Sequence, residues 1–320
     1  MAIAISGILI IIGFFLLIKG ADWLVNGASS LAKRNKVSDL AIGLTIVAFG
    51  TSMPELVVNT IASFNNQSDI VLANVIGSNN FNLFVILGIV GIIFPISVKS
   101  STAWKEIPIS LVTILVLYFL ANELLFQESA VLSMYDGFVL LFLFIAFLYY
   151  VYKQLKTDAY ATEITQDVLS NKKIILLLAG GLVSLIVGGK LVVDNAVAIA
   201  VAFNISNKII GLTIIAAGTS LPELMTSVVA AFKKKSDIAI GNVIGSNIFN
   251  LLFVLPISVM VNPIEYNGTF DVDILVLLTG TALLLLAMIT GKRKKLDRWE
   301  AIIILLLFCL YTIYALNKEL

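Results

Sequence analysis

Long apolar stretches are the feature that most narrows what this chain can fold into. Residues 3–17, 138–151 and 301–316 are three of them, and none contains a charged side chain. A helix needs roughly 20 mostly apolar residues to cross the hydrocarbon core of a bilayer. Charged residues make up only 13% of the sequence, against about 25% in soluble domains. The sequence therefore predicts an all-α integral membrane protein.

Charged or Asn- and Ser-rich clusters separate ten apolar segments, so we expect ten transmembrane helices. The segments start near residues 3, 39, 69, 104, 133, 172, 207, 237, 272 and 298. Placing the amino terminus outside puts most of the 21 Lys and Arg residues in inner loops, as the positive-inside rule requires. Both termini are then extracellular, and we expect a multi-pass protein of the cell (plasma) membrane.

Two blocks of sequence repeat at a constant offset of 168 residues. Residues 38–58 (SDLAIGLTIVAFGTSMPELVV) match residues 206–226 (SNKIIGLTIIAAGTSLPELMT), and residues 69–83 match residues 237–251. Each half holds five predicted spans, so the second half enters the membrane from the opposite side. Inverted repeats of this kind are typical of secondary transporters, which bind substrate at the midplane between the repeats.

The duplication divides the chain into three parts. We expect a first five-helix repeat at residues 1–153, a cytoplasmic linker at residues 154–171 and a second, inverted five-helix repeat at residues 172–320. No soluble domain is inserted between the spans.

The most similar part of the repeat predicts a break in helices 2 and 7. Residues 50–55 read G-T-S-M-P-E and residues 218–223 read G-T-S-L-P-E. Proline removes a backbone donor and clashes with the carbonyl four residues back, and glycine loosens the backbone further. Carbonyls freed at membrane depth must be buried in protein or face a polar cavity, where a cation would satisfy them. The expected helix-breaking residues are Gly50, Pro54, Gly218 and Pro222.

Each break is followed by a glutamate, Glu55 or Glu223. A charged side chain at the bilayer centre costs at least about 2.5–3.5 kcal/mol, so it marks a functional site by default. The alternative is an ion pair with a buried lysine. Lys19 and Lys190 are the candidates, but each has an acidic residue three or four positions away on its own helix, which is the spacing of neighbours. We therefore expect both glutamates to be ion ligands.

Spans 3 and 8 add neutral oxygens at intervals of four residues, which places them on one stripe of each helix. Amide and hydroxyl oxygens are hard ligands that suit calcium and sodium. Hydrogen bonding between helices is the competing role of such residues in membranes, and it stays open, most evenly for the first residue of each stripe. The stripes are Asn74, Ser78 and Asn82 in span 3, and Asn242, Ser246 and Asn250 in span 8.

Composition excludes several other functions. The chain has no histidine and a single cysteine, Cys309, so an internal disulfide, a histidine proton shuttle and a zinc site of the usual kind are excluded. A net charge of +1 gives no reason to expect a nucleic-acid partner. The sequence shows no pairing of a nucleophile with a general base that would indicate an enzyme. The two glutamates give an all-oxygen site a charge of −2. One Ca²⁺ balances this charge, and two or three Na⁺ leave a total of zero or +1, but both loads together are not compensated.

These paired motifs resemble the α-repeats of the sodium/calcium exchanger family, within the calcium/cation antiporter superfamily, in its prokaryotic type without cytosolic regulatory domains. The resemblance covers both halves and implies a sodium/calcium antiporter that works by alternating access at a midplane site, with spans 1 and 6 sliding across the rest. It implies transported Ca²⁺ and Na⁺, no cofactor, membrane lipid as surroundings and function as a monomer. Some members carry Asp where this chain has Asn250. In potassium-dependent relatives that Asp is linked to potassium, so Asn250 argues against potassium coupling.

Carried over by position, the resemblance implies these ligands. Calcium would bind Glu55, Glu223, Thr51 and Thr219. Sodium would bind Ala48, Thr51, Ser52, Glu55 and Ser78, and in the mirror site Ala216, Thr219, Ser220, Glu223 and Ser246. Additional lining residues would be Asn74, Asn82, Asn242 and Asn250. A proton-coupled calcium/cation antiporter is the alternative, and a cation channel is a more distant one.

Overall fold

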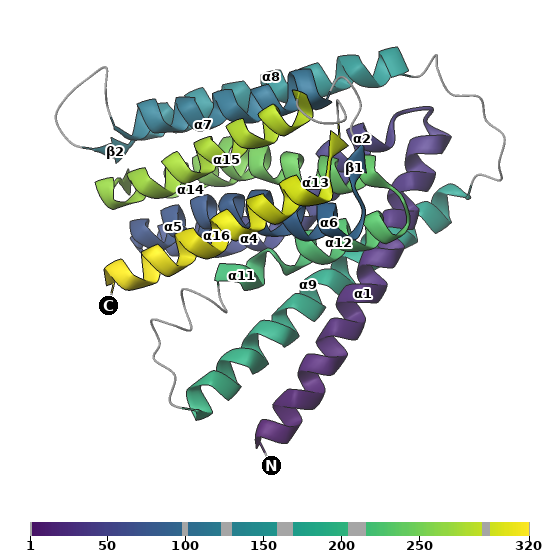
Figure 1. The fold of residues 1–320 in the computed structure, drawn as a ribbon, viewed down its shortest axis with the longest axis horizontal. Coiled ribbons are helices and arrows are strands. Elements are labelled where there is room, and N and C mark those ends of the chain that lie inside the picture. The colour runs from purple at the N-terminus through teal and green to yellow at the C-terminus, as the bar shows by residue number, and fades with distance from the viewer. Residues whose placement is uncertain are drawn as a thin grey trace.

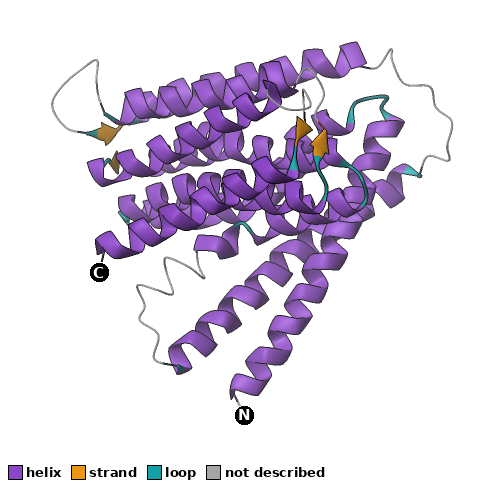
Figure 2. Cartoon of the chain, viewed as in Figure 1, coloured by secondary structure: helices purple, strands orange, loops and turns teal. Residues whose placement is uncertain are grey.

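The computed structural model describes residues 2–97, 102–122, 130–158, 169–203, 216–289 and 295–319. Nearly all of them are helical, as Figure 2 shows. The helices of the first half are α1 (Ala2–Arg34), α2 (Asp39–Ile42), η1 (Gly43–Val47), α3 (Ala48–Thr51), α4 (Met53–Phe64), α5 (Ser68–Asn80), η2 (Phe81–Ile86), α6 (Leu87–Ile93), η3 (Thr102–Glu106), α7 (Ile107–Ala121) and α8 (Met134–Asp158). Those of the second half are α9 (Asn171–Ala202), α11 (Ala216–Thr219), α12 (Leu221–Phe232), α13 (Ser236–Phe249), η5 (Asn250–Val254), α14 (Leu255–Val261), η6 (Gly268–Phe270), α15 (Asp271–Ile289) and α16 (Arg298–Glu319).

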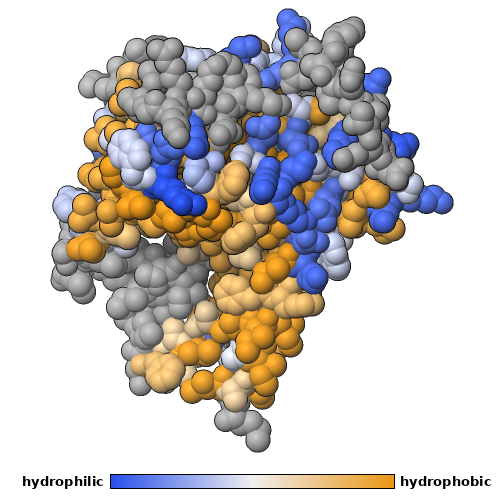
Figure 3. Space-filling model, turned by 45° about the vertical axis from the view of Figure 1, so that its right-hand side comes forward, coloured by the Kyte–Doolittle hydropathy of each residue, from blue (hydrophilic) through white to orange (hydrophobic). Residues whose placement is uncertain are grey.

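The described helices confirm an all-α fold suited to a membrane. Eight of them are long and apolar enough to cross a bilayer, and a ninth span is possible if the bent pair at residues 39–64 counts as one. The first part of the span predicted to start near residue 207, residues 207–215, lies outside the described residues, and α11 and α12 form the part that follows. Large apolar side chains such as Ile11, Phe15 and Phe142 are exposed. Figure 3 shows apolar surface over much of the visible face, with hydrophilic residues gathered towards one end.

Most helices pack as one bundle, and the two longest stand apart from it. Figure 1 shows α1 and α9 side by side at a steep angle to the other helices. Both contact the bundle through α12 and the segments beside it. The chain therefore consists of a two-helix arm, formed by α1 and α9, and a helix bundle that holds the glutamates predicted to bind ions.

Glycines allow the two helices of this arm to touch backbone to backbone. A Cβ placed on Gly20 would lie 2.8 Å from the carbonyl oxygen of Gly181, and one on Gly13 would lie 2.9 Å from that of Gly188. The same contacts recur in reverse, because residues 13 and 20 match residues 181 and 188 in the repeat. Small residues permit such close packing in membranes. The arm is thus a tightly joined pair.

Two short antiparallel strand pairs join loops at the ends of the bundle (Figure 2). The β1 strand (Ile96–Ser97) pairs with β4 (Lys295–Leu296), and both loops carry positive charge predicted to lie inside. The β2 strand (Val131–Leu132) pairs with β3 (Ile264–Glu265), and both of these loops were predicted to lie outside. Each pair therefore joins loops that the charge pattern assigned to the same side of the membrane.

The glycine contact leads to a prediction about stability. Gly20→Ala places a methyl group against the backbone of α9, so we expect it to separate the arm and to destabilise the protein by about 1–3 kcal/mol. The measurement is thermal unfolding of the purified protein in detergent. Gly7→Ala is the matched control, because a Cβ there meets no atom within 4 Å in the described part of the chain. Equal melting temperatures for the two variants would contradict the prediction.

Candidate ion-binding site

The structure interrupts both helices at a serine of the repeated motif. Ser52 lies between α3 and α4 with φ −84° and ψ 7°, and the helices on its two sides are bent by 45°. Ser220 lies between α11 and α12 with φ −87° and ψ 6°. Pro54 and Pro222 follow in the first turn of the next helix, where a missing N–H breaks no intrahelical bond. The break is thus two residues before each proline.

Gly50 and Gly218 also make room for the arm. A Cβ on Gly50 would collide with the side chain of Leu182, and a Cβ on Gly218 with that of Val193. Both of these side chains belong to α9. The two glycines therefore combine a flexible backbone with a close approach of the arm to the breaks.

Each buried glutamate is held by the break of the opposite repeat. Glu55 and Glu223 lie in the first turns of α4 and α12, and both are fully buried. Ser220 Oγ donates to Glu55 Oε1 at 3.4 Å, and Ser52 Oγ donates to Glu223 Oε1 at 3.1 Å. The second carboxylate oxygen, Oε2, of each glutamate has no hydrogen-bond partner among the described residues. Neither glutamate appears in an ion pair within the described chain.

The threonines of the motif also cross between repeats. Thr51 Oγ1 donates to Asn242 Oδ1 at 3.0 Å, and Thr219 Oγ1 donates to Asn74 Oδ1 at 3.2 Å. Thr51 Oγ1 lies within 3.3 Å of the carbonyl oxygen of Ala48, which also accepts the Ser52 N–H at 3.0 Å. Ala216, its counterpart in the repeat, is the first residue of α11.

The serine and asparagine stripes divide into two kinds. Ser246 Oγ donates to Glu223 Oε1 at 3.4 Å, whereas Ser78 Oγ donates to Asn74 Oδ1 at 3.4 Å. The amide groups of Asn74 and Asn242 are hydrogen-bonded to other side chains. Asn74 Nδ2 donates to Asn59, and Asn242 Nδ2 donates to Ser227. For these two asparagines, the structure shows the hydrogen bonding between helices that competed with ion binding in the sequence analysis.

Asn82 and Asn250 differ, because their side-chain oxygens are left unused. Both residues are fully buried, and neither Oδ1 has a hydrogen-bond partner in the described structure. They lie in the π-helical segments η2 and η5, a kind of irregularity that is frequent at functional sites. The sequence analysis missed four residues that bond to the predicted lining asparagines: Asn79, Asn247, Asn59 and Ser227. For Asn79 and Asn247, the repeat of the G-S-N triplet at residues 77–79 and 245–247 was the available signal.

The unpartnered atoms define what the cluster can bind. Buried polar atoms without partners are costly. Among the predicted site residues that the structure describes, four such atoms occur and all are oxygens: Glu55 Oε2, Glu223 Oε2, Asn82 Oδ1 and Asn250 Oδ1. Carboxylate and amide oxygens favour hard cations such as Ca²⁺ and do not favour zinc or copper. The arrangement can therefore hold desolvated hard cations inside the bundle.

Known proteins resemble this chain along nearly its whole length. The family model described as sodium/calcium exchanger protein matches residues 5–153 and 173–317. CaxA of Alkalimonas amylolytica is 38% identical, covering 96% of this chain and 97% of CaxA. The sodium/calcium exchanger MaX1 of Methanosarcina acetivorans is 28% identical, covering 97% of this chain and 98% of MaX1.

A solved structure has the same fold. One structure of the sodium-calcium exchanger NCX_Mj superimposes with a TM-score of 0.82 at 34% identity, covering 96% of this chain and 98% of that one. Family match, sequence identity and fold agree with the resemblance that the two repeated blocks suggested. The chain is a member of the sodium/calcium exchanger protein family.

Proposed function

We propose that this protein is a sodium/calcium antiporter, which moves Ca²⁺ against Na⁺ across the cell membrane by alternating access. The observation that carries the proposal is the pair of buried glutamates, each bonded by a serine of the opposite repeat and each with one free carboxylate oxygen. A buried carboxylate without a cationic partner is strongly destabilised. Bound cations supply the missing charge, so we place ion binding at this cluster.

Charge explains why the two ions exclude each other. The neighbouring ligands are hydroxyl, amide and carbonyl groups, so Glu55 and Glu223 supply the formal charge of −2. One Ca²⁺ neutralises it, and two or three Na⁺ leave a total of zero or +1. Both loads together would leave a large uncompensated positive charge in a medium of low polarity. Exclusive occupancy of one cluster is what couples the two fluxes.

We assign the ligands that the family resemblance implies. The calcium ligands are Glu55, Glu223, Thr51 and Thr219. The sodium ligands are Ala48, Thr51, Ser52, Glu55 and Ser78, together with Ala216, Thr219, Ser220, Glu223 and Ser246. Asn82 and Asn250 line the site with free oxygens, whereas the bonds of Asn74 and Asn242 support a role in positioning the threonines. Pro54, Pro222, Gly50 and Gly218 produce the breaks.

The proposal includes ten transmembrane helices in two inverted repeats, residues 1–153 and 172–320, joined by a cytoplasmic linker at residues 154–171. The two segments that match the family model, residues 5–153 and 173–317, support this division. The strand pairs support the sidedness, because each joins loops assigned to one side. Both termini are extracellular, the protein lies in the plasma membrane, and it works as a monomeric transporter and not as an enzyme.

Coupled transport is the first test of the proposal. In proteoliposomes loaded with Na⁺, we expect rapid uptake of labelled Ca²⁺ when the outside buffer lacks Na⁺, and little uptake when Na⁺ is equal on both sides. An imposed proton gradient without Na⁺ should drive no uptake. Uptake that follows the proton gradient and ignores Na⁺ would instead establish a proton-coupled antiporter. Single-channel currents without a counter-ion requirement would establish a channel.

Neutralising either glutamate is the second test. A unit charge about 4 Å from a cation contributes roughly 4 kcal/mol per cation charge at an effective dielectric constant of about 20, which corresponds to about a thousandfold in affinity. We therefore expect Glu55→Gln and Glu223→Gln to abolish exchange at ordinary Ca²⁺ concentrations while the protein still inserts and purifies. Glu265→Gln, at the exposed position of the β3 strand, is the matched control. Near-normal exchange in both Gln variants would remove the central claim.

A further inference from the structure

Four buried asparagines form a linear hydrogen-bonded network where the two repeats meet, in the order Asn250, Asn79, Asn247 and Asn82. They are Asn79 at the end of α5, Asn82 in η2, Asn247 in α13 and Asn250 at the start of η5. All four are at most 1% exposed. Asn79 Nδ2 donates to the backbone carbonyl of Asn247 at 3.1 Å, and Asn247 Nδ2 donates to that of Asn79 at 3.2 Å. The two bonds are mirror images under the 168-residue repeat.

These two bonds to backbone carbonyls fix the orientation of all four side-chain amides in the network. A backbone carbonyl can only accept, so the atoms of Asn79 and Asn247 that touch it must be nitrogens. Their Oδ1 atoms then face the other two asparagines. Asn250 Nδ2 donates to Asn79 Oδ1 at 3.0 Å, and Asn82 Nδ2 donates to Asn247 Oδ1 at 3.2 Å. The orientation follows from donor and acceptor chemistry alone.

Asn82 and Asn250 are the two ends of this network. Each uses its Nδ2 within the network, and the Oδ1 of each has no hydrogen-bond partner among the described residues. Asn250 lies one helical turn beyond Ser246, which contacts Glu223. Asn82 lies one turn beyond Ser78, on the corresponding stripe of the first repeat. By helix spacing, the free oxygens extend the two oxygen stripes, of which the second contacts Glu223 through Ser246.

We propose that Asn79 and Asn247 are positioning residues for ion binding: Asn79 fixes the amide of Asn250, and Asn247 fixes that of Asn82, so that an oxygen and not an NH₂ group faces the cations. Without them each amide could rotate by 180° and present donors, which repel a cation. The inference rests on the proposed antiport function and deepens it, because it assigns the cation-facing polarity of the site to residues outside the ligand set.

Each positioning residue bonds to an asparagine of the opposite repeat, so double variants can test which residue acts through which. Asn79→Ala and Asn250→Ala should each lower the apparent affinity for Ca²⁺ or Na⁺ about tenfold or more, measured as KM for Ca²⁺ uptake and as the Na⁺ concentration that half-inhibits it. Because Asn79 acts through Asn250, the double variant should be no weaker than Asn250→Ala alone. Combining Asn79→Ala with Asn82→Ala should instead multiply the two effects.

The mirror cycle and a matched control complete the test. Asn247→Ala should be non-additive with Asn82→Ala and additive with Asn250→Ala, and this second cycle serves if Asn79→Ala does not fold. Asn80→Ala removes a buried neighbour that donates to the Asp273 carbonyl on α15, and it should leave both ion affinities unchanged. Additive effects within both crossed pairs, or unchanged affinity in Asn79→Ala and Asn247→Ala, overturn the proposal. The wild type is measured first, so a missing Na⁺-driven Ca²⁺ flux refutes the proposed function instead.

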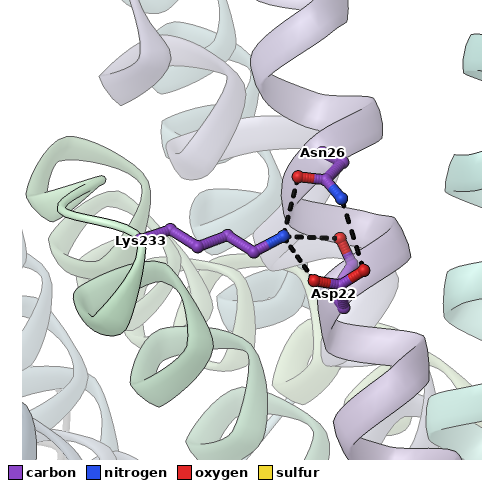
Figure 4. Close-up of polar contacts among 3 residues, drawn as sticks. All are labelled: Asp22, Asn26 and Lys233. Carbon is purple, nitrogen blue, oxygen red and sulfur yellow. Dashed lines mark hydrogen bonds and ion pairs between the residues drawn. The ribbon is translucent and has the colours of Figure 1, made fainter.

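A second, independent observation concerns the two-helix arm. Figure 4 shows Lys233, in the turn after α12, reaching two polar side chains of α1. Its Nζ lies 2.6 Å from Asp22 Oδ1, 2.7 Å from Asn26 Oδ1 and 3.3 Å from the Asp22 carbonyl oxygen. Asn26 Nδ2 in turn donates to Asp22 Oδ2 at 3.3 Å. Sequence spacing favoured Lys19 as the partner of Asp22, and the structure instead joins Asp22 to the bundle.

The corresponding residues of the other repeat do not form this contact. Asp22 and Asn26 correspond to Lys190 and Asp194 of α9, which pair with each other at 3.1 Å on their own helix. The counterpart of Lys233 is the neutral Asn65. The turn that carries Lys233 is also tied to α2, because Lys235 Nζ lies 3.1 Å from Asp39 Oδ2. The arm is thus bound by charge to the bundle through α1, and its mirror positions hold no equivalent ion pair.

We infer that the Lys233–Asp22–Asn26 contact is a latch that favours the conformational state seen here over the state with the opposite access. The inference rests on the proposed alternating access, in which the arm moves relative to the bundle. We take this movement to shift α1 against the turn that carries Lys233, so that the ion pair forms in one state only. A contact made in one state shifts the population towards it.

Apparent affinity at the two membrane faces tests the latch, because each affinity scales with the fraction of molecules open to that face. Lys233→Gln and Asp22→Asn should change KM for Ca²⁺ about twofold in opposite directions in right-side-out and inside-out vesicles. The charge-swapped double variant, Asp22→Lys with Lys233→Asp, should restore the wild-type values. Lys190→Gln is the matched control and should change neither face. A change of the same sign at both faces, or none at either, overturns the latch, whereas absent exchange in the wild type refutes the antiport.

Discussion

Two carboxylates buried in the membrane-spanning bundle are the constraint on which the rest of this structure depends. Neither Glu55 nor Glu223 has a basic partner within the described chain, so each relies on hydroxyl groups and bound cations. Ser220 and Ser52, at the two helix breaks, each donate to the glutamate of the other repeat, and Ser246 adds a hydroxyl from the same half as Glu223. In the described part of the chain, neither glutamate receives a hydrogen bond from the serine at the break of its own helix. The duplication therefore builds one site from two incomplete halves, and the breaks must meet at the centre.

The sequence predicted this centre well because its causes are local. Proline and glycine break a helix wherever they lie, and a glutamate in an apolar segment is costly in any fold. The constant offset then paired Glu55 with Glu223 and predicted opposed halves. The break itself lies at Ser52 and Ser220, which are the residues that reach across to the opposite glutamate. Local rules thus located both the break and its chemistry to within two residues.

Helix spacing could not assign partners across the bundle. It placed Asn74 and Asn82 on one stripe, but only the packing of α5 against α4 and of η2 against α13 shows that one amide is engaged and the other oxygen is free. The same limit explains Asp22, for which the nearest lysine in sequence is not its partner in space. The glycine contacts between α1 and α9 also depend on which helices meet. These features follow from long-range geometry, which a single sequence does not contain.

The symmetry is close at the ion site and broken at the arm, and this difference suits an exchanger. Crossed bonds recur in pairs around the glutamates, so under the proposed alternating access ions from either face would meet nearly the same ligands. A transporter works in both directions only if its two states differ little in free energy. Substitutions at the periphery can then set the balance without altering the ligands. Under the proposed latch, the pairing of Asp22 with Lys233, opposite a neutral Asn65, is a change of that kind, because it involves none of the proposed ion ligands.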